Sequence, residues 1–352
     1  MKILVINLGS TSTKVAVYEN EKPLWVHGAQ HPMDELSAFH TIYEQYAYRR
    51  DFILVSLKEQ GFPLKFDAIM ARGGLLKPTE GGVYEVNEQM KYDLLHAHMQ
   101  HATNLGGLIA DELAGLSHCR AFIADPAVVD ELMPKARLTG IPEITRVSLF
   151  HALNSKAVSR RYAMLQGRKY EEMNLIVAHL GGGISVGAHC KGRVIDVNNA
   201  LNGDGSFTPE RAGTIPSDQL VELCFSGRYT KQEIKKMLCG KGGLAAHLHN
   251  TDVREVAEKA ANGEKPYKEV LDSMLYNVSK QIGAVSVALQ GKIDAIILTG
   301  GIAFSSYCTR EIENYIGFLA PVVIMPGEDE MGALASNALA VLCKERKVHV
   351  YK

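Results

Sequence analysis

Short apolar runs alternate with longer stretches of helical periodicity along the chain. The apolar runs of the first half, each about the length of one strand, lie at residues 3–6, 15–17, 24–27, 66–71 and 120–124. Helical patterns lie between them at residues 39–60 and 87–116, the second with an expected break at residues 104–107. Such alternation predicts a layered α/β domain, with helices packed on a sheet.

The second half continues this pattern. Helices are predicted at residues 149–165, 218–223, 231–237, 272–289 and 329–345, and strands at the apolar runs that begin at residues 175 and 294. The segment at residues 198–215 is rich in Asn, Gly, Pro and polar residues. Its length and composition predict a functional loop.

The most informative pattern is a pair of glycine loops in the same setting. Residues 3–17 and 175–188 each contain an apolar run, a polar residue followed by Leu-Gly, a tight turn and a second apolar run. Each segment predicts a β-hairpin whose turn can bind phosphate. Two such turns in one chain suggest a clamp on a polyphosphate.

The similarity between the halves extends beyond the loops. Residues 67–74 match residues 294–301, and more weakly residues 122–126 parallel residues 322–326. Three strand-and-loop pairs in the same order predict a duplicated α/β domain.

A length of 352 residues fits about two domains. We expect an amino-terminal domain at residues 1–148 and a carboxy-terminal domain at residues 149–328. The last helix, within residues 329–352, is predicted to pack back on the first domain. No linker separates the halves, so a tight interface between them is expected.

Composition narrows the possible partners and surroundings. The net charge of −1 gives no reason to expect nucleic acid or an anionic membrane surface as a partner. The amino terminus enters a strand directly, and no apolar stretch approaches the length of a membrane span. The six cysteines are scattered without a CxxC pair, as in reduced proteins of the cytoplasm.

The two loops carry the first candidate binding residues. In the amino-terminal turn, Gly9 exposes backbone N–H groups, and the polar side chains that could contact phosphate are Ser10, Thr11, Ser12, Thr13 and Lys14. The turn joins two strands and lacks the GxxxxGK[ST] pattern of a P-loop. In the second loop, Gly181, Gly182 and Gly183 let a ligand approach the backbone. His179 precedes them at the position equivalent to Asn7.

Charged residues at strand ends and in the polar loop are further candidates. Arg72 ends a buried strand before Gly73 and Gly74, and Arg211 lies in the polar loop. Guanidinium groups in such places suit a carboxylate or a phosphate. Asp125 ends another strand and could contact a metal or substrate. The acids at residues 328–330 could bind Mg²⁺ through water, or could simply favour a helix dipole.

A group of histidines has a less specific signal. His98 and His101 could share a helix face, but His96 points elsewhere. No Glu or Cys completes a metal-ligand spacing with them.

These motifs resemble those of the acetokinase family, within the superfamily of actin, Hsp70 and sugar kinases. The resemblance rests on the glycine loops at residues 7–14 and 179–183, on the strand ends at residues 72–74 and 299–301, and on residues 150–154 and 326–331. It spans essentially the whole chain, and the details are most similar to the members that phosphorylate butyrate. At residues 151–156 the chain departs from the FHGTSH-like motif of acetate-specific members.

The resemblance implies a fold and a site. The fold is two duplicated actin-like (ribonuclease H-like) α/β domains with an ATP cleft between them. The implied catalytic residues are Arg72, Asp125, His179 and Arg211, with His179 stabilising the transition state. The implied ATP/ADP-binding residues are Asn7, Ser10, Thr11, Ser12, Lys14, Gly181, Gly182, Gly183, Gly300 and Gly301. For Mg²⁺ the implied ligands are Asn7 and Glu328, with Asp329 or Glu330 as alternatives to the latter.

The implied reaction is reversible, Mg²⁺-dependent phosphorylation of butanoate by ATP, giving butanoyl phosphate, in a cytoplasmic homodimer. Gly73, Gly74 and Leu75 are predicted to form the acyl pocket, because glycines there leave room for a longer chain. The alternatives are a kinase for isobutyrate, propionate or acetate, an actin/Hsp70-like ATP switch, and a sugar kinase in which Asp125 would act as a base. The two arginines favour a carboxylate kinase over a switch.

Overall fold

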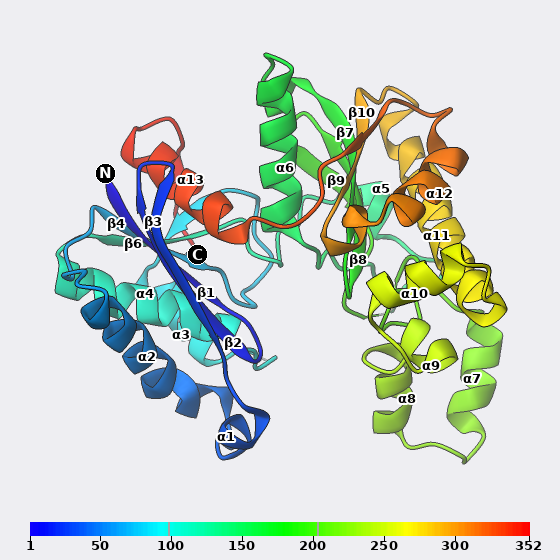
Figure 1. Cartoon of the computed structure of the whole chain (residues 1–352), viewed down its shortest axis with the longest axis horizontal. Coiled ribbons are helices and arrows are strands. Elements are labelled where there is room, and N and C mark those ends of the chain that lie inside the picture. The colour runs from blue at the N-terminus through cyan, green and yellow to red at the C-terminus, as the bar shows by residue number, and fades with distance from the viewer. Residues whose placement is uncertain (98, 203) are drawn as a thin grey trace. The chain divides into compact units, whose positions relative to one another are not determined.

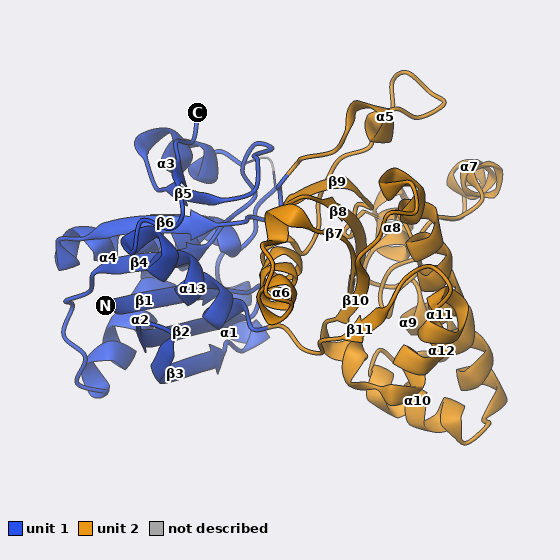
Figure 2. Ribbon diagram, turned by 90° about the horizontal axis from the view of Figure 1, so that it is seen from above, with its two compact units in different colours: residues 1–129, 329–352 blue, residues 130–328 orange. Residues whose placement is uncertain are grey.

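The computed structural model describes residues 1–97, 99–202 and 204–352. The chain forms two compact units, unit 1 at residues 1–129 with 329–352 and unit 2 at residues 130–328 (Figure 2). Each unit is built on one β-sheet with helices on its faces (Figure 1).

Unit 1 has a seven-stranded sheet in the order β12-β5-β6-β4-β1-β2-β3. Its strands are β1 (Lys2–Leu8), β2 (Ser12–Glu19), β3 (Lys22–Gln30), β4 (Ala68–Arg72), β5 (Val83–Glu85), β6 (Arg120–Ala124) and β12 (Val348–His349). Its α-helices are α1 (Met33–Ser37), α2 (Gln45–Glu59), α3 (Glu88–Leu95), α4 (Thr103–Ser117) and α13 (Glu330–Leu342). Both α4 and α13 pack on β1, β4 and β6, and they cover opposite faces of the sheet.

The predicted helix break at residues 104–107 is wrong. The helix α3 ends at Leu95 and α4 begins at Thr103, so Gly106 and Gly107 lie inside α4. A Cβ on Gly106 would lie 2.8 Å from the Arg72 carbonyl oxygen. These glycines therefore let α4 approach the sheet closely. The close packing compensates for the low helix propensity of glycine.

Unit 2 has a five-stranded sheet in the order β11-β10-β7-β8-β9. Its strands are β7 (Asn174–Leu180), β8 (Ile184–Cys190), β9 (Arg193–Val197), β10 (Ala295–Thr299) and β11 (Val322–Ile324). Its α-helices are α5 (Pro134–Arg137), α6 (Ala152–Leu165), α7 (Ser217–Phe225), α8 (Lys231–Leu238), α9 (Leu244–Leu248), α10 (Val253–Ala261), α11 (Lys265–Ser286) and α12 (Ser306–Ile316).

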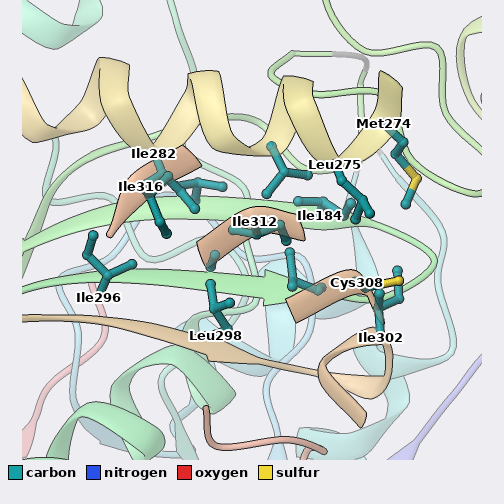
Figure 3. Close-up of a cluster of buried hydrophobic side chains, with 14 of the residues drawn as sticks. Ile184, Met274, Leu275, Ile282, Ile296, Leu298, Ile302, Cys308, Ile312 and Ile316 are labelled. Carbon is teal, nitrogen blue, oxygen red and sulfur yellow. The ribbon is translucent and has the colours of Figure 1, made fainter. Parts of the chain in front are cut away.

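Both faces of the unit 2 sheet are buried, and neighbouring residues of one strand belong to different clusters of hydrophobic side chains. On β10, Ile296 and Leu298 pack against α11 and α12, as Figure 3 shows. Ala295 and Ile297 of the same strand belong to the cluster that includes Val158 of α6. Side chains alternate across a strand, so a run that is apolar at every position fills both faces.

The duplication predicted from the three sequence pairs is confirmed. The order β3-β2-β1-β4-β6 in unit 1 corresponds to β9-β8-β7-β10-β11 in unit 2. In both units the hairpin strands are antiparallel, and the first of them pairs in parallel with β4 or β10.

The division between the compact units falls after Val129, whereas the sequence placed residues 130–148 in the first domain. These residues bond to β9: the Met133 N–H donates to the Ile195 carbonyl at 2.9 Å, and Arg146 pairs with Asp196 at 2.9 Å. Residues 130–148 carry no strong helical or strand pattern, and their hydrogen bonds to β9 place them in unit 2. Among the helices described, none has both the length and the apolar character that a membrane crossing requires.

Candidate functional site

The amino-terminal loop consists of residues 9–11 between β1 and β2 and of Ser12, the first residue of β2, and it turns its carbonyl groups toward protein donors. The guanidinium of Arg49, on α2, donates to the carbonyl oxygens of Gly9 at 3.0 Å, Ser10 at 2.8 Å and Ser12 at 2.8 Å. The fourth carbonyl, of Thr11, accepts from the His31 N–H at 2.7 Å. In the part of the chain that the structure describes, the N–H groups of Ser10 and Thr11 have no acceptor. Donors without acceptors and occupied carbonyls make the loop suitable for an anion.

The side chains of the loop contact residues that the sequence left unassigned. The Ser10 hydroxyl lies 3.0 Å from Nε2 of His101, which lies between α3 and α4. Burial, together with the charges of Arg72 and Arg49, lowers the pKa of His101, so the ring is neutral at pH 7. Lys14 is exposed and lies opposite Asn7 on the paired strands. His98 lies outside the described residues.

The ends of β1 and β4 bring together an amide, a guanidinium and a carboxylate. The Asn7 Nδ2 donates to Glu330 at 2.7 Å, and Arg72 pairs with the same carboxylate at 3.1 Å. Asp329 instead caps α13 by accepting from the Gly332 N–H at 2.8 Å. Of the three acids that the sequence left open, Glu330 is therefore the one that contacts Asn7.

Asp125 follows β6 and lies at the same sheet edge, since Arg72 pairs with Ala124 in register. The side chain is buried, and one of its carboxylate oxygens accepts from the Gly82 N–H at 2.8 Å. Its φ of 38° lies in the left-handed region that non-glycine residues seldom adopt. The conformation is held by a second bond, from the Asp125 N–H to the Gly82 carbonyl at 2.9 Å. Asp125 thus links the end of β6 to the residue before β5.

The glycines that follow Arg72 are close-packed. A Cβ on Gly73 would lie 2.7 Å from the Pro126 Cβ, and one on Gly74 would lie 2.7 Å from the Asn104 Cα. The Leu75 N–H donates to the Asn104 side chain at 2.8 Å. Protein atoms therefore fill the space beside both glycines, and the missing side chains by themselves leave no room for an acyl chain.

In unit 2 the structure brings Arg211 and the second glycine loop together. A Cβ on Gly183 would overlap the Arg211 guanidinium, which also donates to the Ala200 carbonyl. The Thr208 hydroxyl donates to the Gly182 carbonyl at 2.7 Å and accepts from the Arg211 N–H at 3.1 Å. Only glycine at position 183 leaves space for this cation.

His179 is buried at the end of β7, within a set of polar contacts. Asn154, on α6, donates its amide to Nδ1 at 2.9 Å, so a neutral ring carries its proton on Nε2. That Nε2 lies 3.6 Å from the Glu328 carboxylate. The ring stacks on His151, with 3.8 Å between centroids, and the Ser185 hydroxyl lies 3.0 Å from Nδ1 of His151. Glu328 thus lies beside the histidine pair.

A pocket of about 810 Å³ opens beside the second glycine loop. Its walls combine apolar side chains with carboxylates, and they include Gly181, Gly182, Glu210, Asp252, Val253, Ala257, Glu258, Gly301, Ile302, Phe304 and Tyr307. Gly300, which precedes Gly301, has a φ of 86°, and a Cβ there would overlap the Leu180 backbone. Gly300 is thus required by the fold, while Gly301 lines the pocket.

Several site residues were missed by sequence reasoning. Arg49 contacts the amino-terminal loop from a helix without any motif, and Asn154 contacts His179 from within the motif at residues 150–154, where sequence reasoning assigned it no role. His101 and Glu330 were among the sequence candidates, and the structure adds their contacts with Ser10 and Asn7. For His151 a signal existed, since it lies within the motif at residues 150–154. Within the described ranges, no three His, Cys, Asp or Glu side chains form a group that could hold a metal.

Comparisons with known proteins identify relatives of the whole chain. A model of the acetokinase family matches residues 140–320. The chain is 68% identical to a probable butyrate kinase of Phocaeicola vulgatus, over 100% of this chain and 99% of that protein. It is 54% identical to a probable butyrate kinase of Bacteroides thetaiotaomicron, over 100% of both chains.

Among solved structures, the acetate kinase of Porphyromonas gingivalis is similar, with a TM-score of 0.79 at 21% identity. The match covers 97% of this chain and 99% of that one. At this identity the likeness shows a shared fold.

Proposed function

Because the chain belongs to the acetokinase family, we propose that it catalyses reversible transfer of a phosphoryl group from ATP to butanoate, giving ADP and butanoyl phosphate. The observation that best supports phosphoryl transfer to a carboxylate is the presence of one arginine at a candidate site in each unit. Arg72 lies at a strand end in unit 1, and Arg211 lies beside a glycine loop in unit 2. The choice of butanoate rests on the full-length identity to proteins named as butyrate kinases.

Unit 1 is proposed to hold the phosphates and the metal. The Ser10 and Thr11 N–H groups offer unused donors to phosphate oxygens. Asn7 and Glu330 supply oxygen atoms of the kind that Mg²⁺ prefers, and Mg²⁺ commonly takes one or two carboxylates together with substrate phosphates. Mg²⁺, when bound, neutralises part of the polyphosphate charge. We favour Glu330 over Glu328 as the metal ligand, since it is the acid that contacts Asn7.

Unit 2 is proposed to hold the nucleoside and to stabilise the transferring group. The 810 Å³ pocket has the size and the mixed lining of a small-molecule site. With Asn154 donating to its Nδ1, His179 presents an Nε2–H donor, and Arg211 presents a guanidinium held against Gly183. Such fixed donors stabilise charge that develops on a phosphoryl group.

The chemistry needs no general base on the acceptor. A carboxylic acid with a pKa of about 4 is ionised at pH 7. One carboxylate oxygen attacks the γ-phosphorus, the bond from phosphorus to the β–γ bridging oxygen breaks, and no proton moves. The main barrier is repulsion between two anions, which the arginines reduce. We therefore propose that Asp125 acts through its place in the structure, as the link between β6 and Gly82, and accepts no proton.

Three further parts of the proposal rest on the family and the composition. We place the protein in the cytoplasm, as a homodimer, with Mg²⁺ as its metal. The six free cysteines are consistent with a reducing compartment.

The test is a hydroxylamine trapping assay with ATP, Mg²⁺ and a series of acids from acetate to valerate, with isobutyrate included. Acyl hydroxamate highest with butyrate supports the proposal. A maximum with acetate, propionate or isobutyrate keeps the mechanism and changes the substrate. Hydroxamate with none of the acids overturns the proposal and favours the ATP switch or the sugar kinase.

A further inference from the structure

Arg49 is a buried cation without an anionic partner. Its residue exposure is 0%, although α2 lies on the protein surface. Its donors go to Gln45 at 3.0 Å, to the Thr13 hydroxyl at 3.3 Å and to the three loop carbonyls. No carboxylate of the described residues pairs with it. Burial lowers the pKa of its guanidinium, yet arginine stays protonated in proteins.

Such an arrangement is costly unless something compensates the charge. A buried charge without a partner is strongly disfavoured, and carbonyl dipoles offset only part of the cost. By contrast, the neighbouring Arg50 is partly exposed and pairs with Asp51 at 2.8 Å and Glu112 at 3.2 Å. The two arginines share a helix, but only Arg49 lacks a counter-ion.

The loop above Arg49 is the one with unused N–H donors. Because Arg49 and His31 occupy all four carbonyls of residues 9–12, no carbonyl of the loop is left to repel an anion. We propose that Arg49 is a positioning residue whose charge is balanced by the polyphosphate chain bound at this loop. This inference rests on the proposed function, and it adds that unit 1 recognises polyphosphate independently of the nucleoside.

The test compares two substitutions that both remove the planar guanidinium. Arg49→Lys keeps the charge, whereas Arg49→Gln removes it. The probes are inorganic tripolyphosphate with Mg²⁺, for the loop, and adenosine, for the pocket of unit 2. Arg50→Gln is the matched control on the same helix. Binding is measured by calorimetry, and KM for ATP and kcat by the trapping assay.

We expect tripolyphosphate to bind Arg49→Gln about 10- to 100-fold more weakly than Arg49→Lys, with unchanged adenosine affinity. KM for ATP rises in parallel, with a smaller change in kcat. Equal tripolyphosphate affinity of the two variants overturns the proposal, and so does a parallel loss of adenosine binding, which indicates general damage to the fold.

A measurement on the unsubstituted protein decides the matter if Arg49→Gln does not fold. In ¹⁵N spectra, the Arg49 Nε–H signal is identified by its absence from Arg49→Lys. We expect tripolyphosphate to shift this signal and adenosine to leave it in place, and no shift with tripolyphosphate contradicts the proposal. Absence of acyl hydroxamate from the unsubstituted enzyme, by contrast, refutes only the proposed function.

Discussion

The two units share a scaffold and differ at the ends of its strands. In unit 1 the Asp67 carboxylate accepts from the Lys2 N–H at 2.6 Å, and in unit 2 Asp294 accepts from the Asn174 N–H at 2.7 Å. The matched aspartates thus have the same structural role. Asp67 bonds the start of β4 to β1, and Asp294 bonds the start of β10 to β7.

The next residues diverge in their chemistry. At the end of β4, Arg72 pairs with a carboxylate, whereas at the end of β10 the equivalent Thr299 donates to the Gly327 carbonyl at 3.0 Å. One glycine loop has a buried arginine beneath its carbonyls, and the other has Arg211 packed against Gly183. Duplication therefore preserved the strands, while each unit acquired different binding groups in equivalent loops.

The largest effect is expected when the strand-end cation of unit 1 is removed. Arg72→Ala deletes the partner of Glu330 and a charge proposed to offset the repulsion between two anions. We expect kcat/KM for butyrate to fall about 10³-fold in the trapping assay. The control is Arg120→Ala, which removes an exposed pair with Glu85. A fall no greater than that of the control contradicts the role of Arg72.

Unit 2 offers the corresponding test through a glycine. The Cβ of Gly183→Ala would overlap the Arg211 guanidinium and displace it. We expect kcat to fall about 10²-fold, the usual cost of losing a preorganised donor. Gly283→Ala is the control, since a Cβ there meets nothing within 4 Å. Unchanged kcat in Gly183→Ala would show that Arg211 is not needed where the structure places it.

A substitution at the glycines after Arg72 shows whether they are needed for close packing or for the choice among acids. Gly74→Ala would place a Cβ 2.7 Å from Asn104 and Leu94 atoms, and we expect a loss of about 1–3 kcal/mol in the free energy of unfolding. The preference among acids should stay the same. Gly115→Ala on α4, with open space around it, serves as the control in urea unfolding. A stable variant whose preference moves to acetate would support the sequence-based prediction of an acyl pocket at Gly73, Gly74 and Leu75.

The smallest effect concerns a histidine in the core of unit 2. Complete burial lowers the pKa of His189 well below that of the unfolded chain. The unfolded state then binds the proton first, so stability is full above about pH 6.5 and falls as the pH decreases. We expect His189→Gln to flatten this fall by up to about 1.4 kcal/mol per pH unit, measured by urea unfolding from pH 7 to 5. Equal slopes in His189→Gln, the unsubstituted protein and an exposed-site control, His40→Gln, would exclude His189 as the cause.

The scaffold could be predicted because buried strands and repeats leave local signals. The matched aspartates, glycine loops and apolar runs predicted the hairpins and the strands that recur in both units, but they did not predict the order of the strands in either sheet. Arg72 and Asp125 were predicted because each ends a buried strand, and Asn7 was predicted from its place before the first glycine loop. The structure places all three at one edge of the sheet, where the carboxyl ends of neighbouring parallel strands meet.

Side-chain partners across the fold could not be predicted in this way. Arg49 and Asn154 lie on helices whose periodicity gives no sign that they reach a loop. The choice of Glu330 among three adjacent acids depends on how α13 approaches β1. The glycines at positions 73 and 74 carried an ambiguous signal, because close packing and an open pocket both require the absence of a side chain.

In the proposed reaction a carboxylate oxygen of butanoate accepts the phosphoryl group. The most direct measurement supplies butanoate labelled with ¹⁸O in both carboxylate positions, together with unlabelled ATP, and records the ³¹P spectrum of the product. We expect an acyl phosphate signal shifted by one ¹⁸O bonded to phosphorus. An unshifted acyl phosphate signal, or inorganic phosphate without any acyl phosphate, would contradict it.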